Sequence, residues 1–226
     1  MHYFTFAEKD TTLYQNTSSL NAGLDEILEV RKDITSTGAS VNVSRALIRF
    51  DLSQISSSMV RRTIKSPRFY LNLYDANPSS LATSQSLYAY PVSGSWVMGD
   101  GRSYDNPITT EGASWKYKDG LINGTLWPGT VSSSGGQWYD GDGYVASSSL
   151  THKTSDVRME VTDIVNKWLA LTMPNEGFMI KRSGSVGNLD SGSDEGDTTR
   201  FGNLSFFSTD THTKYPPTLE TVWNDS

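Results

Sequence analysis

Apolar and polar residues alternate along several short stretches of this 226-residue chain, and this pattern constrains the fold more than any other feature. In the stretch 46–52, Ile48 and Phe50 fall on one face, whereas Arg49 and Asp51 fall on the other. Side chains of a β-strand point alternately to the two faces of its sheet, whereas helical side chains repeat about every 3.6 residues. The alternation therefore predicts strands with one buried and one solvent-facing side.

The pattern recurs along the chain and predicts an all-β fold. The clearest further strands lie at 69–74, 157–161, 177–181, 204–207 and 218–223, and shorter candidates lie at 13–15, 26–30, 87–91 and 114–117. Short strands that each bury one face are typical of two antiparallel sheets packed together. Sandwiches of this length commonly form one domain. We therefore expect residues 1–226 to form a single, jelly-roll-like antiparallel β-sandwich.

One short helix is predicted inside this β pattern, directly after Val161. Ile164, Val165 and Trp168 share one face at helical spacing, which is the stripe that a helix buries against a core. Thr162 is the expected N-cap, because its side-chain oxygen can accept a hydrogen bond from a free N–H of the first turn. We expect Trp168 to be a core residue rather than a ligand platform.

A long loop insertion at 94–143 interrupts the strand pattern. It is rich in Gly, Ser and Asp, and many of its apolar residues are aromatic. Long loops in compact domains commonly carry function or form interfaces. The sequence-based candidates for an interface or a glycan-binding surface are Trp115, Trp127, Trp138 and Tyr139. The alternative is that these rings pack as a small core beneath their own loop.

Residues that support catalysis or metal binding are sparse. The chain has no cysteine, and His2, His152 and His212 lie far apart, outside any zinc-binding pattern. We therefore expect no enzymatic activity, cofactor or metal. The acidic, Gly-containing segment 190–197 offers the oxygen ligands that Ca²⁺ prefers, but its spacing is not that of an EF-hand. A solvated acidic loop between strands explains this segment without an ion, and we favour that interpretation.

Charge and hydropathy exclude two classes of partner. The formal net charge is −6, and the largest basic groups are pairs such as those at 61–62 and 181–182, so no basic face for nucleic acid is expected. No apolar run approaches the roughly 18 residues of a membrane span. Residues 1–10 lack the pattern of a secretory signal, so we expect synthesis in the cytosol.

Taken in order, several segments resemble those of the DNRLRE-type domain family. The matching stretches are RALIRFDLS at 45–53, FYLNLY at 69–74, VSGSW at 92–96 with SW at 114–115, VTDIVNKWL at 161–169, EGFMIK at 176–181, and the closing segments at 200–208 and 217–220. The resemblance spans nearly the whole chain and implies a jelly-roll-like β-sandwich. Relatives are commonly modules of large secreted or wall-attached bacterial proteins, and some bind polysaccharide.

The closing run at 201–217 is also similar to virion structural proteins of tailed phages of marine bacteria. This resemblance implies a non-enzymatic structural component of the virion, in the head decoration, the neck or the tail. Its partners would be other virion proteins and copies of itself, as a homo-oligomer or ring. The alternative function is a carbohydrate-binding module of a bacterial surface or secreted protein, with Trp115, Trp127 or Trp138 as the sugar platform.

Overall fold

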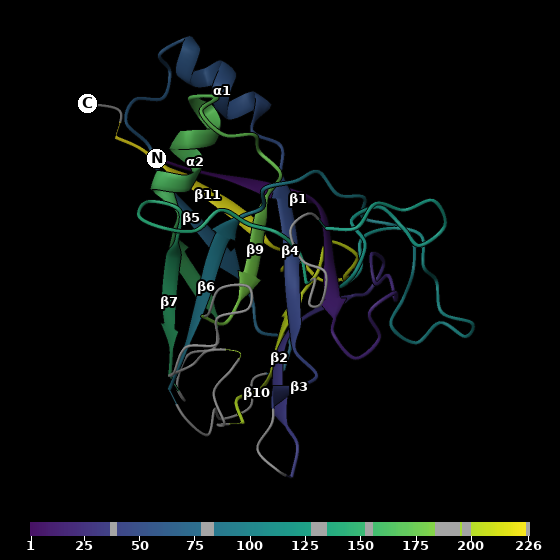
Figure 1. Cartoon of the computed structure of the whole chain (residues 1–226). Coiled ribbons are helices and arrows are strands. Elements are labelled where there is room, and N and C mark those ends of the chain that lie inside the picture. Colours follow the sequence, from purple (N-terminus) through teal and green to yellow (C-terminus); the bar gives the residue numbers. More distant parts are fainter. Residues whose placement is uncertain are drawn as a thin grey trace.

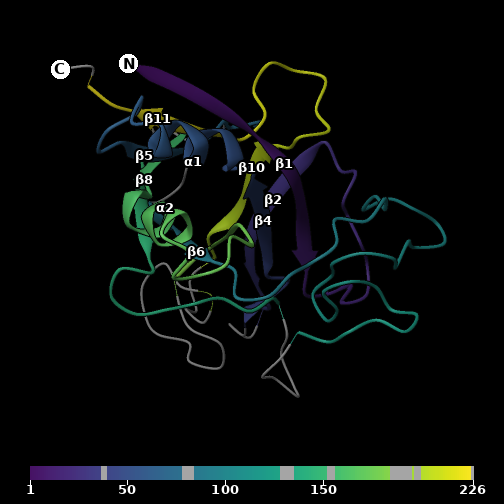
Figure 2. The same cartoon turned by 90° about the horizontal axis from the view of Figure 1, so that it is seen from above.

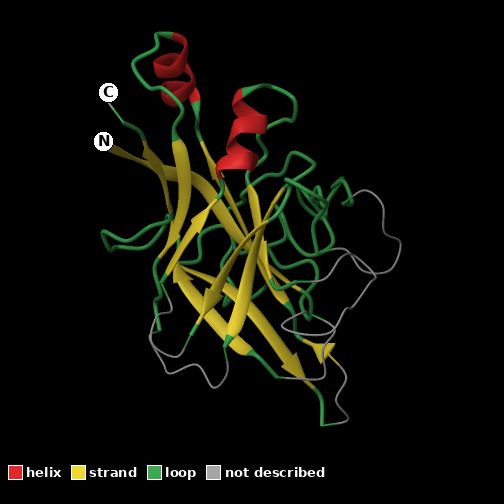
Figure 3. Ribbon diagram, turned by 90° about the vertical axis from the view of Figure 1, so that its left-hand side faces the viewer, coloured by secondary structure: helices red, strands yellow, loops and turns green. Residues whose placement is uncertain are grey.

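The chain folds into eleven strands and two short helices in a computed structural model (Figures 1 and 3). The structure describes residues 1–36, 40–77, 84–127, 135–151, 156–183, 195 and 200–224. The strands are β1 (His2–Tyr14), β2 (Ile27–Ile34), β3 (Ser40–Val41), β4 (Ser44–Phe50), β5 (Arg68–Leu73), β6 (Gln85–Pro91), β7 (Ala146–Leu150), β8 (Val157–Glu160), β9 (Phe178–Lys181), β10 (Gly202–Phe207) and β11 (Thr218–Val222), and the helices are α1 (Ser53–Val60) and α2 (Thr162–Leu169). The predicted all-β class is confirmed.

The long strand β1 joins the two layers of the fold. Its first half pairs with β11 and its second half pairs with β4, and the register shifts between Ala7 and Lys9. Such an irregularity bends a strand and lets it pass from one layer to the other. The resulting antiparallel sheet has the order β7-β6-β9-β4-β1-β11-β5-β8 and is nearly closed, and β10-β2-β3 forms a second sheet. The fold is β-sandwich-like, and the finer assignment as a jelly roll stays a prediction.

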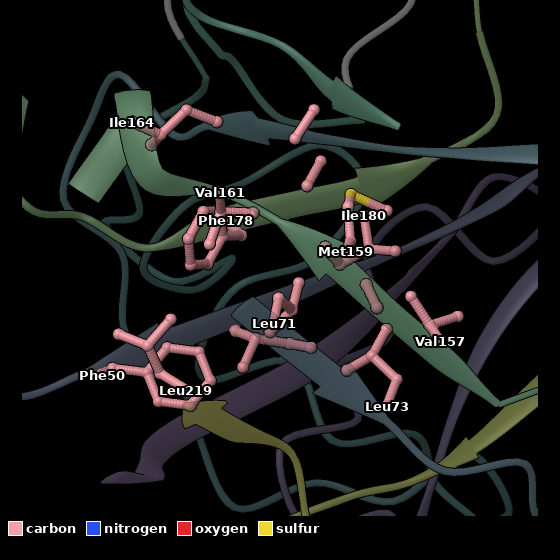
Figure 4. Packing of buried hydrophobic residues seen from close by; sticks show 14 of the residues in the cluster. Phe50, Leu71, Leu73, Val157, Met159, Val161, Ile164, Phe178, Ile180 and Leu219 are labelled. Atoms are coloured by element: carbon pink, nitrogen blue, oxygen red, sulfur yellow. The ribbon is translucent and has the colours of Figure 1, made fainter. Parts of the chain in front are cut away.

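The main core lies between these layers, where the buried faces of the strands meet. Ile48 and Phe50 of β4 belong to this core, as their alternation predicts. Figure 4 shows Phe50 beside Leu219 of β11, with Leu71 of β5 nearby. Helix α2 closes one end, and the Trp168 ring lies 4.6 Å from the Phe178 ring. The predicted core role of Trp168 is therefore confirmed.

Two expectations about helices were wrong. A second helix, α1, follows β4, although its serine-rich sequence offers only Ile55 and Met59 to the main core and fully buries only Ile55. The carboxylate of Asp51 starts this helix by accepting hydrogen bonds from the backbone N–H and the hydroxyl of Ser53. In α2 the N-cap is Val161, because the hydroxyl of Thr162 accepts a hydrogen bond from the backbone N–H of Phe69 instead.

Several strands also differ from expectation, and three differences are large. β1 covers 13 residues, whereas only 13–15 were predicted. The predicted strand at 114–117 is absent, since this part of the described chain forms only one bridge, between Tyr117 and Leu126. β7 was not predicted, because its sequence Ala-Ser-Ser-Ser-Leu has no apolar alternation. It lies at the end of the sheet order, beside β6.

Candidate interaction site

The long loop between β6 and β7 lies beside the sheet and covers the outer face of β1, β4 and β9 (Figure 1). Trp96, Trp115 and Trp127 pack there against Leu13, Leu47 and other residues of the sheet in a second buried cluster. Trp115 and Trp127 are only 6% and 1% exposed. Both rings lie inside the protein, as in the alternative that the sequence left open, and neither offers a face to a ligand in this conformation.

Trp138 and Tyr139 are half-buried at the edge of the same loop. The Trp138 ring covers two buried cations, with its centroid 5.0 Å from the Arg45 guanidinium and 4.9 Å from the Lys181 ammonium. Tyr139 lies against the main core. A role for these two side chains in an interface or in glycan binding stays a prediction.

A buried ion pair lies beneath the rings of Trp115 and Trp138, at the guanidinium of Arg45. The guanidinium of Arg45 donates two hydrogen bonds to the carboxylate of Glu195, at 2.9 and 2.6 Å. Glu195 is the one residue of the acidic segment 190–197 that the structure describes, and the remainder of that calcium candidate lies outside the described residues. Among the described residues, no group of three or more His, Cys, Asp or Glu side chains is placed to hold a metal ion.

The first half of β1 forms an open sheet edge. β11 pairs with residues 2–6, but β4 pairs with β1 only from Ala7 onward. The backbone N–H of Ala7 donates to the carbonyl of Pro217, and Met1 and Trp223 exchange both hydrogen bonds. Because antiparallel pairs alternate in this respect, the N–H and C=O groups of residues 2, 4 and 6 point away from β11. No described residue hydrogen-bonds them on that side.

The exposed side chains of this edge are aromatic. Phe4 and Phe6 point to the outer face of the sheet and are 46% and 60% exposed. Between His2 and Ala7 the strand has no acidic residue, lysine or proline, which are the residues that commonly protect an edge from pairing. The start of β1 and the end of β11 lie together beside α1 at one end of the molecule (Figure 2). The N–H and C=O groups along this edge therefore have the geometry that an added strand would use.

A separate groove of ≈ 550 Å³ opens where the end of β1, the start of β2 and the long loop meet. Its lining includes Tyr14, Asp25, Glu29, Arg31 and Tyr104. Tyr104 stands at its edge and is 76% exposed. The Glu29 carboxylate accepts a hydrogen bond from Arg31, at 2.9 Å, and burial raises the pKa of the Asp25 carboxyl. With more carboxylates than cations, the groove disfavours anionic ligands.

Sequence reasoning missed both the open edge and the groove. The edge had a detectable signal, namely aromatic residues at positions 3, 4 and 6 without a protecting charge, whereas the groove is assembled from segments that are distant in sequence. Comparison with known protein families and with curated proteins finds no match to this chain. Neither α1 nor α2, the helices in the part of the chain that the structure describes, has the length and apolar character needed to cross a membrane.

Proposed function

We propose that this protein is a non-enzymatic structural component of a tailed-phage virion and that it acts through protein–protein interfaces. The observation that supports this proposal best is the open edge of β1, with its unpaired main-chain groups and the exposed rings of Phe4 and Phe6. Main-chain hydrogen bonds along such an edge provide affinity for an added strand, and exposed side chains provide selectivity. The virion as the setting is supported by the resemblance of the run at 201–217.

The arrangement favours assembly over catalysis. An open aromatic edge is a liability for a freely diffusing protein, because it promotes uncontrolled strand pairing. In an assembled particle, a neighbouring strand covers the same edge and the liability disappears. Partners are other virion proteins and further copies of this chain, in the head decoration, the neck or the tail.

Mass spectrometry of purified virus particles, compared with the proteins that the host secretes, tests the proposal. We expect the protein in intact particles at a constant ratio to the major capsid protein, and at a much lower level in the proteins secreted by the host. Absence from particles, together with presence among the secreted proteins, would contradict a virion role.

The groove beside Tyr104 supports a second candidate function, the binding of a neutral polysaccharide. An exposed tyrosine ring can stack on a sugar, and the carboxylates of Asp25 and Glu29 can accept hydrogen bonds from sugar hydroxyls. The test is affinity electrophoresis in gels containing neutral polysaccharides. We expect Tyr104→Ala to abolish any retardation and Tyr104→Phe to retain it. Equal retardation of both variants would exclude this groove as the glycan site.

A further inference from the structure

We infer that the open edge of β1 pairs with the same edge of a second copy of this chain, antiparallel and across a two-fold axis at Phe4. This inference rests on the proposed function, because both use the open edge of β1. It goes further in naming a second copy of this chain as the partner. A two-fold interface requires that one surface complements itself. Residues 2–6 meet this requirement in their main chain and in their side chains, as follows.

The main-chain groups are spaced symmetrically about Phe4. The outward N–H and C=O groups belong to residues 2, 4 and 6, since the groups of Met1 and Ala7 bond toward β11. With the axis at Phe4, His2 faces the partner's Phe6 and Phe4 faces the partner's Phe4. Each of these facing pairs exchanges two hydrogen bonds in an antiparallel ladder, and no outward group of residues 2–6 is left unpaired.

The side chains across such a ladder attract one another. Phe4 and Phe6 lie on the outer face, so the rings of two copies meet as aromatic cross-strand neighbours. Like charges opposite each other would oppose a symmetric pair, but the first charged residues after His2 are Glu8 and Lys9. They lie at the register shift, where β4 begins to pair with β1 and the open edge ends.

Self-pairing also explains why residues 2–6 of the open edge contain no feature that blocks strand pairing. An edge strand that does not pair with another chain commonly contains an inward-pointing charge, a proline or a β-bulge. Here the irregularity lies between Ala7 and Lys9, directly beyond the five residues that the ladder uses. Because the strand is short, the interface is at the small end of specific interfaces, and we expect a reversible dimer.

Sedimentation velocity of the full chain, over about 5 to 200 µM, tests the inference. We expect a concentration-dependent dimer, which Phe4→Asp and Phe4→Lys each weaken at least tenfold, because identical charges then meet at the axis. An equimolar mixture of the two variants should restore the dimer, since residue 4 faces residue 4. The matched control is Ile122→Asp, which adds a charge at another exposed apolar residue, on the long loop, and should dimerise as the unmodified chain does.

A cross-link provides an independent readout, because the natural chain has no cysteine. Phe4→Cys should form a disulfide-linked dimer on mild oxidation, since facing residues of such a ladder lie about 5.5 Å apart at Cα. Ile122→Cys should not. A monomer at all concentrations, or a dimer that Phe4→Asp leaves intact, would overturn the inference. The proposed function can stand although the self-pairing fails. This outcome requires that both the unmodified chain and Phe4→Asp are monomers, and that only the unmodified chain joins particles.

Discussion

Asp10 is a buried carboxylic acid on β1, and replacing it with asparagine should change the pH dependence of stability in a defined direction. Its Oδ2 accepts a hydrogen bond from the backbone N–H of Thr209, at 2.8 Å, and its Oδ1 accepts one from the Thr209 hydroxyl, at 3.1 Å. Burial raises the pKa of this carboxyl to about 7 from an ordinary value of 3.8, and the hydrogen bonds from Thr209 offset part of that effect.

The direction of the effect follows from the raised pKa. Between pH 3.8 and about 7, the folded protein holds a proton on Asp10 that the unfolded chain has released. Lowering the pH through this window therefore stabilises the fold, and the cost of the buried charge is fully present only above pH 7. A shift of this size corresponds to about 4 kcal/mol in the free energy of unfolding.

The asparagine side chain of the Asp10→Asn variant stays neutral at every pH and can still accept the hydrogen bond from the N–H of Thr209. We therefore expect this variant to be more stable than the natural protein at pH 8, by up to about 4 kcal/mol, and by less than about 2 kcal/mol at pH 5. Urea unfolding followed by circular dichroism at both pH values measures this difference. The exposed Asp142→Asn is the control and should show the same small difference at both. A stability difference for Asp10→Asn that does not change between pH 5 and pH 8 would refute the reasoning.

Three further substitutions test the packing of the long loop, each by urea unfolding. Trp127→Ala should lower the free energy of unfolding by about 3–5 kcal/mol, because it empties the second cluster, and a loss below about 1 kcal/mol would contradict that packing. Gly135→Ala should lower the free energy of unfolding by about 2–4 kcal/mol, because its Cβ would lie 2.5 Å from the Arg45 guanidinium at a φ of +96°. Gly141 has a similar φ of +98° but lies in open space, so Gly141→Ala should lower it by only about 1 kcal/mol. Equal losses for the two variants would contradict the close contact. Arg45→Met should lower the free energy of unfolding by about 3 kcal/mol or more, because it leaves Glu195 buried without its main partner. Adding Glu195→Gln should recover part of that loss, and no recovery would contradict the role of the ion pair.

The strands that the sequence predicts best are those with one polar face. β8 alternates clearly, because Val157 and Met159 meet the main core while Arg158 and Glu160 are exposed. β4 shows the alternation only around Arg49, because Leu47 on its other face is buried beneath the long loop. The first half of β1 escaped prediction for the opposite reason. Its exposed residues Phe4 and Phe6 are apolar, whereas Thr5 on the less exposed face is polar, so the alternation there does not mark the buried face. The part of the chain where alternation fails to predict the strand is thus the same part that we propose as the interface.

The site itself was harder to predict, because the sequence does not reveal which side of a long loop faces the protein. Trp115 and Trp127 lie in the same glycine-rich loop as Tyr104. The two tryptophans meet a patch formed by Leu13 and Leu47, from strands distant in sequence, and become buried. Tyr104 meets no such patch and stays exposed. Only the three-dimensional arrangement of the sheet separates these outcomes.

Hydrogen–deuterium exchange of the segment 1–8, in the isolated chain and in purified particles, tests the central claim that the open edge of β1 is the assembly interface. The amides of Phe4 and Phe6 point away from β11 and should exchange quickly in the isolated chain at low concentration. In particles, where a neighbouring strand covers the edge, we expect the same amides to exchange at least about 100-fold more slowly. Equally fast exchange in both states would contradict the account.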